Sequence, residues 1–179
     1  EGRGDEEKED KEEDNNQEEC ELDGEAKLQN AVERLDTIMN KFVNVAIPLP
    51  FLAPVSNYTV QLANSLLKDI ESKDETNSGG VIENLLPKCI TAIEERDFCM
   101  CRIVGADLEF SLYNQLQTRG SWPDSVHRQA YWCAAITAAI GFANEGSFLV
   151  AIKLLDKAVI LGQDRKPLED FFSYVELHA

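Results

Sequence analysis

Apolar residues recur at intervals of three and four along most of the chain, which is the spacing of one face of an α-helix. Such runs predict helices over about 25–44, 56–70, 81–120, 121–144 and 147–162, and a last helix from Pro167. The first helix carries its stripe on Leu28, Val32, Leu35, Ile38, Met39, Phe42 and Val43. Strand-like alternation of apolar and polar residues is not evident anywhere in the sequence. The pattern therefore predicts an all-α protein.

Proline, glycine and serine residues set the expected limits of these helices. Three prolines between residues 45 and 55 predict an extended segment, because proline lacks the amide donor that a helix interior needs. They are Pro48, Pro50 and Pro54. A loop that dips into a membrane is the alternative for this apolar segment. Ser121, followed by Trp-Pro-Asp, predicts a capped helix start, and Gly120 and Gly162 predict helix ends.

Charge divides the chain into two parts. Residues 1–25 hold 14 acidic and 3 basic side chains, which leaves only −5 of the total net charge of −16 for the remainder. Leu22 is the one large apolar residue of the leader, so burial cannot offset an ordering cost of about 1–2 kcal/mol per residue. We expect a disordered acidic tail over 1–24 and a single helical domain over 25–179. The tail either steers a partner with a basic surface or is a linker left by processing of a precursor.

Composition excludes several classes of function. An apolar content of 44% in 179 residues is sufficient for one domain with a core. No cluster of lysine and arginine offers a face to nucleic acid. The apolar segments fall short of the roughly 20 residues of a transmembrane helix, and no signal peptide is evident. We expect an intracellular, soluble protein with reduced thiols, since its five cysteines form an odd set.

The segment 132–165 carries a distinctive order of aromatic and small residues. They are Ala139, Phe142, Gly146, Phe148, Ala151, Leu155 and Ala158. This order and spacing resembles the tetratricopeptide repeat (TPR), a helix-turn-helix unit of about 34 residues. The sequence departs from the family at Ala135, Ala138 and Gln163, so the repeat is degenerate. A generic bundle is the alternative, because alanine is the best helix former in any context.

The TPR resemblance implies stacked antiparallel helical hairpins, one of them near 124–162, in which neighbouring helices complete the core. It also implies a scaffold that holds a peptide or another protein, without catalysis or a cofactor. The order of acidic leader, helical body and TPR-like C-terminal part is similar to that of organelle assembly factors, including those that help to build photosynthetic complexes in plastids. That similarity implies a protein partner, plastid localisation and peripheral association with a membrane complex.

Four residues around the corner at 119–131 are candidate partner contacts, because tryptophan, tyrosine and arginine are favoured where proteins meet. They are Arg119, Trp122, Arg128 and Tyr131. For Trp122, the alternative is a hydrophobic staple that anchors the start of its helix.

Catalytic and metal chemistry find little support in the sequence. A small helical enzyme, or a thiol- or metal-dependent protein using Cys99, Cys101 and His127, is the alternative function. One intervening residue on a helix turns the two thiols about 200° apart, which is a poor arrangement for zinc. We therefore expect no metal, no cofactor and no catalytic residue. The acidic side chains of Glu94, Glu95 and Asp97 are expected on the solvated face of a helix.

Overall fold

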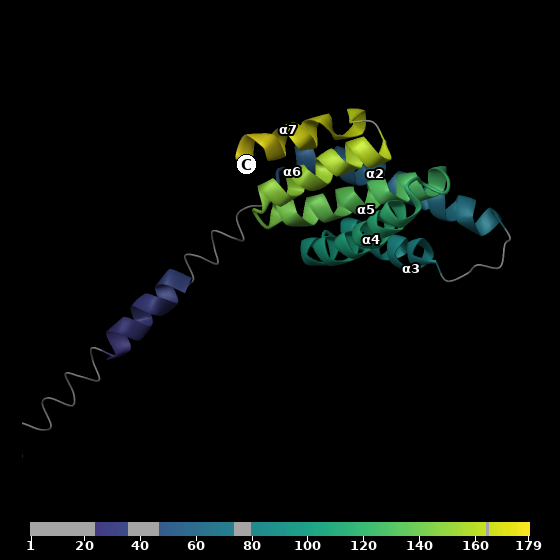
Figure 1. The fold of residues 1–179 in the computed structure, drawn as a ribbon. Coiled ribbons are helices and arrows are strands. Elements are labelled where there is room, and N and C mark those ends of the chain that lie inside the picture. Colours follow the sequence, from purple (N-terminus) through teal and green to yellow (C-terminus); the bar gives the residue numbers. More distant parts are fainter. Residues whose placement is uncertain (1–23, 36–46, 74–79, 164) are drawn as a thin grey trace, which may run out of the picture. The chain divides into compact units, whose positions relative to one another are not determined.

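The structure is a computed structural model, and it describes four stretches of the chain (Figure 1). They are residues 24–35, 47–73, 80–163 and 165–179. Contacts divide the chain into two units, Glu1–Asn44 and Val45–Ala179, and each is described by itself. The predicted acidic tail lies outside the described residues except for Gly24, so the domain boundary at residue 25 stays a prediction.

In the first unit, residues 24–35 form a helix. Leu28, Val32 and Leu35 are exposed on it at intervals of four and three residues, so they lie on one side. This agrees with the described part of the helix predicted over 25–44. The rest of that prediction, over 36–44, lies outside the described residues.

The second unit is built from helices. They are α2 (Leu49–Ser72), α3 (Val81–Glu94), α4 (Phe98–Arg119), α5 (Ser125–Asn144), α6 (Phe148–Lys157) and α7 (Glu169–His178). A π-helical turn, Ala158–Gly162, extends α6, and a 3-10 turn, Lys166–Leu168, precedes α7. Within the described ranges no strand is present, which confirms the prediction of an all-α fold.

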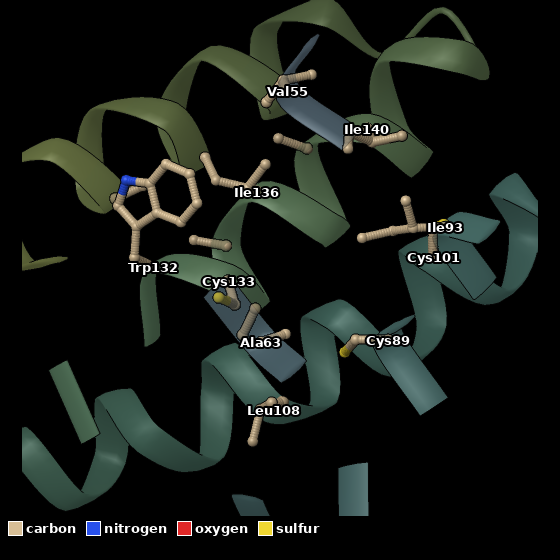
Figure 2. Packing of buried hydrophobic residues seen from close by; sticks show 14 of the residues in the cluster. Val55, Ala63, Cys89, Ile93, Cys101, Leu108, Trp132, Cys133, Ile136 and Ile140 are labelled. Atoms are coloured by element: carbon tan, nitrogen blue, oxygen red, sulfur yellow. The ribbon is translucent and has the colours of Figure 1, made fainter. Parts of the chain in front are cut away.

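Helix α5 lies at the centre of this unit and packs against α2, α3, α4 and α6 (Figure 1). Almost every residue from Ala130 to Ala143 is buried, whichever side of the helix it occupies. Figure 2 shows Trp132, Ile136 and Ile140 of α5 within the core. A helix that is apolar all round has no solvent face, so α5 is a true core helix.

Glycines bring α4 and α5 close together. A Cβ built on Gly105 of α4 would lie 2.4 Å from the Ala138 nitrogen of α5. A Cβ built on Gly141 of α5 would lie 2.4 Å from the Arg102 nitrogen of α4. Each side chain would therefore meet the backbone of the opposite helix. Gly105 does not interrupt α4; it allows the two helices to approach.

The connections α3–α4 and α5–α6 form the same turn. In the first, Asp97 N–H donates to Ala92 O at 3.0 Å and Arg96 N–H to Ile93 O at 3.2 Å. The equivalent bonds of the second join Ser147 to Phe142 at 2.9 Å and Gly146 to Ala143 at 3.0 Å, with each position 50 residues later. Both are Schellman motifs, in which a left-handed residue ends the first helix. The unit thus contains two consecutive helical hairpins with matching turns.

The extended segment predicted from the prolines was wrong. Helix α2 begins directly after Pro48, whose carbonyl accepts bonds from the amides of Phe51 and Leu52 at 3.0 and 3.2 Å. Pro50 stands in the first turn, where a missing amide donor removes no helical bond. Pro54 removes only one bond, and packing of the neighbouring apolar side chains in the core favours the helix. Ser56, where the second helix was predicted to begin, lies inside α2.

The predicted start of α5 and the predicted position of Asp97 on a helix face were also wrong. Asp124, rather than Ser121, caps α5, and its carboxylate accepts from the amide of His127 at 2.8 Å. Asp97 does not lie on a helix face but caps α4, accepting from the amide of Met100 at 3.1 Å. The end of α4 was correct, since Gly120 adopts the left-handed conformation (φ 80°) there.

Gly162 differs from its predicted role as a helix cap. It belongs to the π-helical turn, and a Cβ at this position would lie 2.8 Å from the Cβ of Trp132. Gly162 therefore makes room for the indole side chain of α5.

Candidate functional site

A groove of about 360 Å³ lies along α2, beside the end of α3 and the start of α4. Its apolar lining includes side chains from four helices. They are Leu49, Leu52, Ala53 and Val60 of α2, Ile93 of α3, Phe98 of α4 and Ile140 of α5. The volume is within the range of about 300–1,000 Å³ that ligand sites occupy. The groove is therefore large enough for a few side chains of a bound segment.

Polar groups complete the lining of this groove. Helix α2 contributes Ser56, Asn57 and Gln61, and the end of α3 and the following turn contribute Glu94 and Arg96. The carboxamides of Asn57 and Gln61 can each donate and accept hydrogen bonds. Polar and apolar groups share the lining about equally, which suits a bound segment that offers both apolar side chains and hydrogen-bonding groups.

Arg96 is the cation among the residues that line the groove, and it is exposed. Its guanidinium forms no ion pair or hydrogen bond with any residue that the structure describes. Its backbone is left-handed (φ 54°), which is uncommon for a residue other than glycine. The turn thus presents at the groove a strained residue whose charge has no partner among the described residues.

Alternate residues of the α3–α4 turn line different cavities. Glu94 and Arg96 line the groove beside α2, whereas Glu95 and Asp97 line a second cavity of about 270 Å³ between α3 and α4. Lys88 and Met100 belong to this second cavity. The groove beside α2 therefore has one acidic and one basic group, whereas the second cavity has two acidic groups and one basic group.

Tyr131, one of the predicted partner contacts, is fully buried. Its hydroxyl donates to Glu109 Oε1 at 2.7 Å, and Lys157 Nζ lies 3.6 Å from the same oxygen. Burial and the bond to Glu109 raise the pKa of Tyr131. The Tyr131 side chain therefore joins α5 to α4 in the interior and is not presented at the surface.

Trp122 is half-buried and lies against Tyr131, with 5.3 Å between their ring centroids. Its Nε1 donates to Leu161 O at 2.7 Å, which ties the segment before α5 to the π-helical turn. These contacts match the anchoring alternative for Trp122. Arg119 and Arg128 are exposed, and their role as partner contacts stays a prediction.

The residues of the alternative, thiol-dependent function do not form a site. Cys101 is buried, and burial raises its pKa to about 12, so it is not a ready nucleophile. Cys99 is exposed. His127 is far from the two cysteines. The part of α4 that holds them packs beside Gly141 of α5, which lies against Arg102. His127 is 14 residues earlier on α5, about 21 Å away along the helix axis. His127 Nδ1 is 2.8 Å from Asp124 Oδ1 and thus belongs to the helix cap.

Cys89 and Cys133 are also core residues. Burial raises the pKa of Cys89 to about 12 and raises that of Cys133 further. Among the described residues, no three histidine, cysteine or acidic side chains gather where they could hold a metal ion.

The sequence did not predict the groove, because the groove depends on α2. The three prolines concealed the first turns of this helix, and those turns supply Leu49, Leu52 and Ala53. One sequence signal could have indicated the corner at Arg96: Asp97 followed by apolar residues is a helix-start pattern.

Comparison with known proteins identifies no relative: no family model, curated protein or solved structure matches this chain. Within the described stretches, no helix has the length and apolar character needed to cross a membrane.

Proposed function

We propose that this protein is a non-enzymatic adaptor or assembly factor that binds another protein through the groove between α2 and the α3–α4 turn. The observation that carries this proposal is the combination of an apolar lining with exposed polar groups, Asn57, Gln61 and Arg96. Apolar side chains of a partner segment would be buried in the groove, and its main chain would bond to the polar groups.

A TPR-like scaffold is part of the proposal. Two consecutive hairpins with the same Schellman turn support it, as does the complete burial of Ala151 and Ala158 beside α5. Hairpins of this kind cannot bury their apolar faces alone, so each relies on its neighbours. The role of the scaffold is to hold α2 against α3 and α5 and so to shape the groove.

We extend the proposal to assembly of a photosynthetic membrane complex in plastids, with the protein peripheral to the membrane. This rests on similarity of layout, namely the acidic leader before a TPR-like helical body. Immunodetection in purified plastid fractions of the native source tests it, and exclusive recovery outside plastids contradicts it.

A matched pair of substitutions on α2 tests the groove. Ser56 lines the groove, whereas Ser65 is exposed on the same helix and lies outside the groove. Ser56→Trp fills the site, and Ser65→Trp adds the same indole elsewhere. Circular dichroism first establishes that both variants are folded.

The tagged proteins are then used for capture from the native source, followed by mass spectrometry. We expect partners that bind the wild type and Ser65→Trp but not Ser56→Trp. A photo-crosslinking residue at Asn57 should join the groove to a specific peptide of such a partner. Equal capture by both tryptophan variants would contradict binding in this groove.

A further inference from the structure

The two matching turns differ at the residue that adopts the left-handed conformation. Gly146 holds this position in the α5–α6 turn, with φ 84°, and Arg96 holds it in the α3–α4 turn, with φ 54°. The hydrogen bonds around the two residues are equivalent, so the backbone requirement is the same. Glycine is the usual residue here because it has no Cβ to oppose a positive φ.

The Arg96 side chain does not compensate for this strain within the described part of the protein. It is exposed, and its guanidinium has no polar partner there. Strained residues of this type are enriched at ligand sites and at switch regions. The side chain of Arg96 lines the groove beside α2, where an arginine can act on a bound segment.

The charges of the groove define the group that fits beside Arg96. Glu94, the acidic residue of the groove, ends α3 in an ordinary helical conformation. Of the two charged residues, only Arg96 has a strained, left-handed backbone. A guanidinium forms its strongest bonds with a carboxylate, through two parallel N–H donors. The last residue of a peptide offers a carboxylate together with its own amide N–H, which suits a groove that both Arg96 and Glu94 line.

We propose that Arg96 anchors the C-terminal carboxylate of a partner whose last residues are apolar and occupy the groove. This inference rests on the proposed function. Leu49, Val60 and Phe98, the more exposed apolar residues of the lining, receive the apolar side chains, and Asn57 and Gln61 bond to the main chain of the segment. Arg96 is thus a binding residue that the fold retains although glycine would suit the turn better.

A reciprocal exchange of the two left-handed residues tests the strain. Arg96→Gly should raise the thermal midpoint by about 2–4 °C, because it relieves the left-handed arginine. Gly146→Arg should lower the midpoint by a similar amount, since it introduces the same strain at the matching turn. A lower midpoint for Arg96→Gly would show that the arginine supports the fold, and it would overturn the proposal.

Binding is measured on the full chain with a library of fluorescent apolar hexapeptides, each made as a free C-terminal acid and as a C-terminal amide. The wild type and Gly146→Arg should prefer the acid form at least about tenfold, which is the contribution of one charge-assisted hydrogen bond. Arg96→Gly should lose that preference and bind both forms as the wild type binds the amide. Arg96→Lys should retain part of the preference for the acid form, because lysine keeps the positive charge but lacks the two parallel N–H donors of the guanidinium.

Equal affinity of the wild type for acids and amides, or an unchanged preference in Arg96→Gly, would overturn the role of Arg96. The groove function survives either result if Ser56→Trp still abolishes hexapeptide binding. If no hexapeptide of either form binds the wild type, the carboxylate proposal is overturned. The groove function is then decided by the capture experiment that compares Ser56→Trp with Ser65→Trp.

Discussion

Gly105 of α4 faces Ala138 of α5 so closely that a Cβ on the glycine would lie 2.4 Å from the alanine nitrogen and 2.9 Å from its Cα. The opposing atoms belong to a helix backbone, which cannot turn aside as a flexible side chain can. Gly141 repeats the relationship further along α5, against Arg102 and Phe98 of α4. The separation of the two helices is therefore set by a pair of glycines.

We predict that Gly105→Ala destabilises the protein by about 3 kcal/mol, at the upper end of the range for overpacked cores, because α4 and α5 must separate. Alanine would otherwise stabilise a helix by about 1 kcal/mol relative to glycine, so the sign of the effect is diagnostic. Urea denaturation measures the change. Gly80→Ala is the control, since nothing lies within 4 Å of its Cβ and its φ of −66° suits alanine. Equal stability of the two variants would contradict the close approach.

The buried alanines of the second hairpin give a second prediction. Ala151 and Ala158 are fully buried, so leucine at either position forces extra methylene groups into a packed interface. We expect a loss of about 1–3 kcal/mol for each substitution. Lys153 is exposed on the same helix, and Lys153→Ala should change stability by no more than about 0.5 kcal/mol. If chemical denaturation gives Ala151→Leu and Ala158→Leu the same stability as Lys153→Ala, the hairpin is not closely packed.

Helical periodicity predicted the fold class because most helices of this chain have one apolar face. The helical periodicity of α5 is weaker, since a helix that is buried on every side has apolar residues in every direction. Its end was still predictable, because Gly146 follows it and ends the helix in a left-handed conformation. The equivalent end of α3 lacked this glycine signal, since Arg96 occupies the position where glycine is expected, and only Asp97 indicated the start of the next helix.

The candidate site could not be predicted because its residues come from separate parts of the chain. Local rules for proline excluded the start of α2, yet burial of Leu52 and Val55 in the core outweighs one missing hydrogen bond there. Residue type suggested Trp122 and Tyr131 as surface contacts, but aromatic residues serve the core equally well. Only tertiary packing distinguishes the two roles.

Stability should fall in mildly alkaline solution because of the buried thiols. Burial raises the pKa of Cys89 and Cys101 from 9.0 to about 12, whereas the same thiols ionise near 9 in the unfolded chain. Their contribution is thus complete below pH 9 and is lost as the pH rises from 9 towards 12. Each thiol should account for about 1.4 kcal/mol per pH unit in that window.

Urea midpoints at pH 8 and pH 10 measure this dependence. Cys89→Ala should reduce the loss between the two pH values, because the variant has one buried thiol fewer to ionise on unfolding. Cys99→Ala is the matched control: its thiol is exposed, so the variant should retain the pH dependence of the wild type. If the wild type, Cys89→Ala and Cys99→Ala all lose the same stability between pH 8 and pH 10, groups other than the Cys89 thiol cause the loss.

The buried carboxylate of Glu109 has two partners of different kinds, and they should contribute unequally. Tyr131 donates a hydrogen bond to Glu109 Oε1 at 2.7 Å from a fully buried position. Lys157 Nζ lies 3.6 Å from the same oxygen and 4.6 Å from the centroid of the Tyr113 ring, but its side chain is 44% exposed. Water and salt therefore screen the ion pair much more than the hydrogen bond.

We predict that Tyr131→Phe costs about 1–3 kcal/mol, because it leaves a buried carboxylate oxygen without its closest donor. Lys157→Met keeps an unbranched apolar stem over Tyr113 and should cost less than about 1 kcal/mol. Denaturation at low salt and at 0.5 M salt (roughly a 4–5 Å screening length) separates the two effects. The loss in Lys157→Met should shrink with salt, whereas the loss in Tyr131→Phe should not. The opposite order would mean that the ion pair, rather than the tyrosine, stabilises the buried charge that joins α4, α5 and α6.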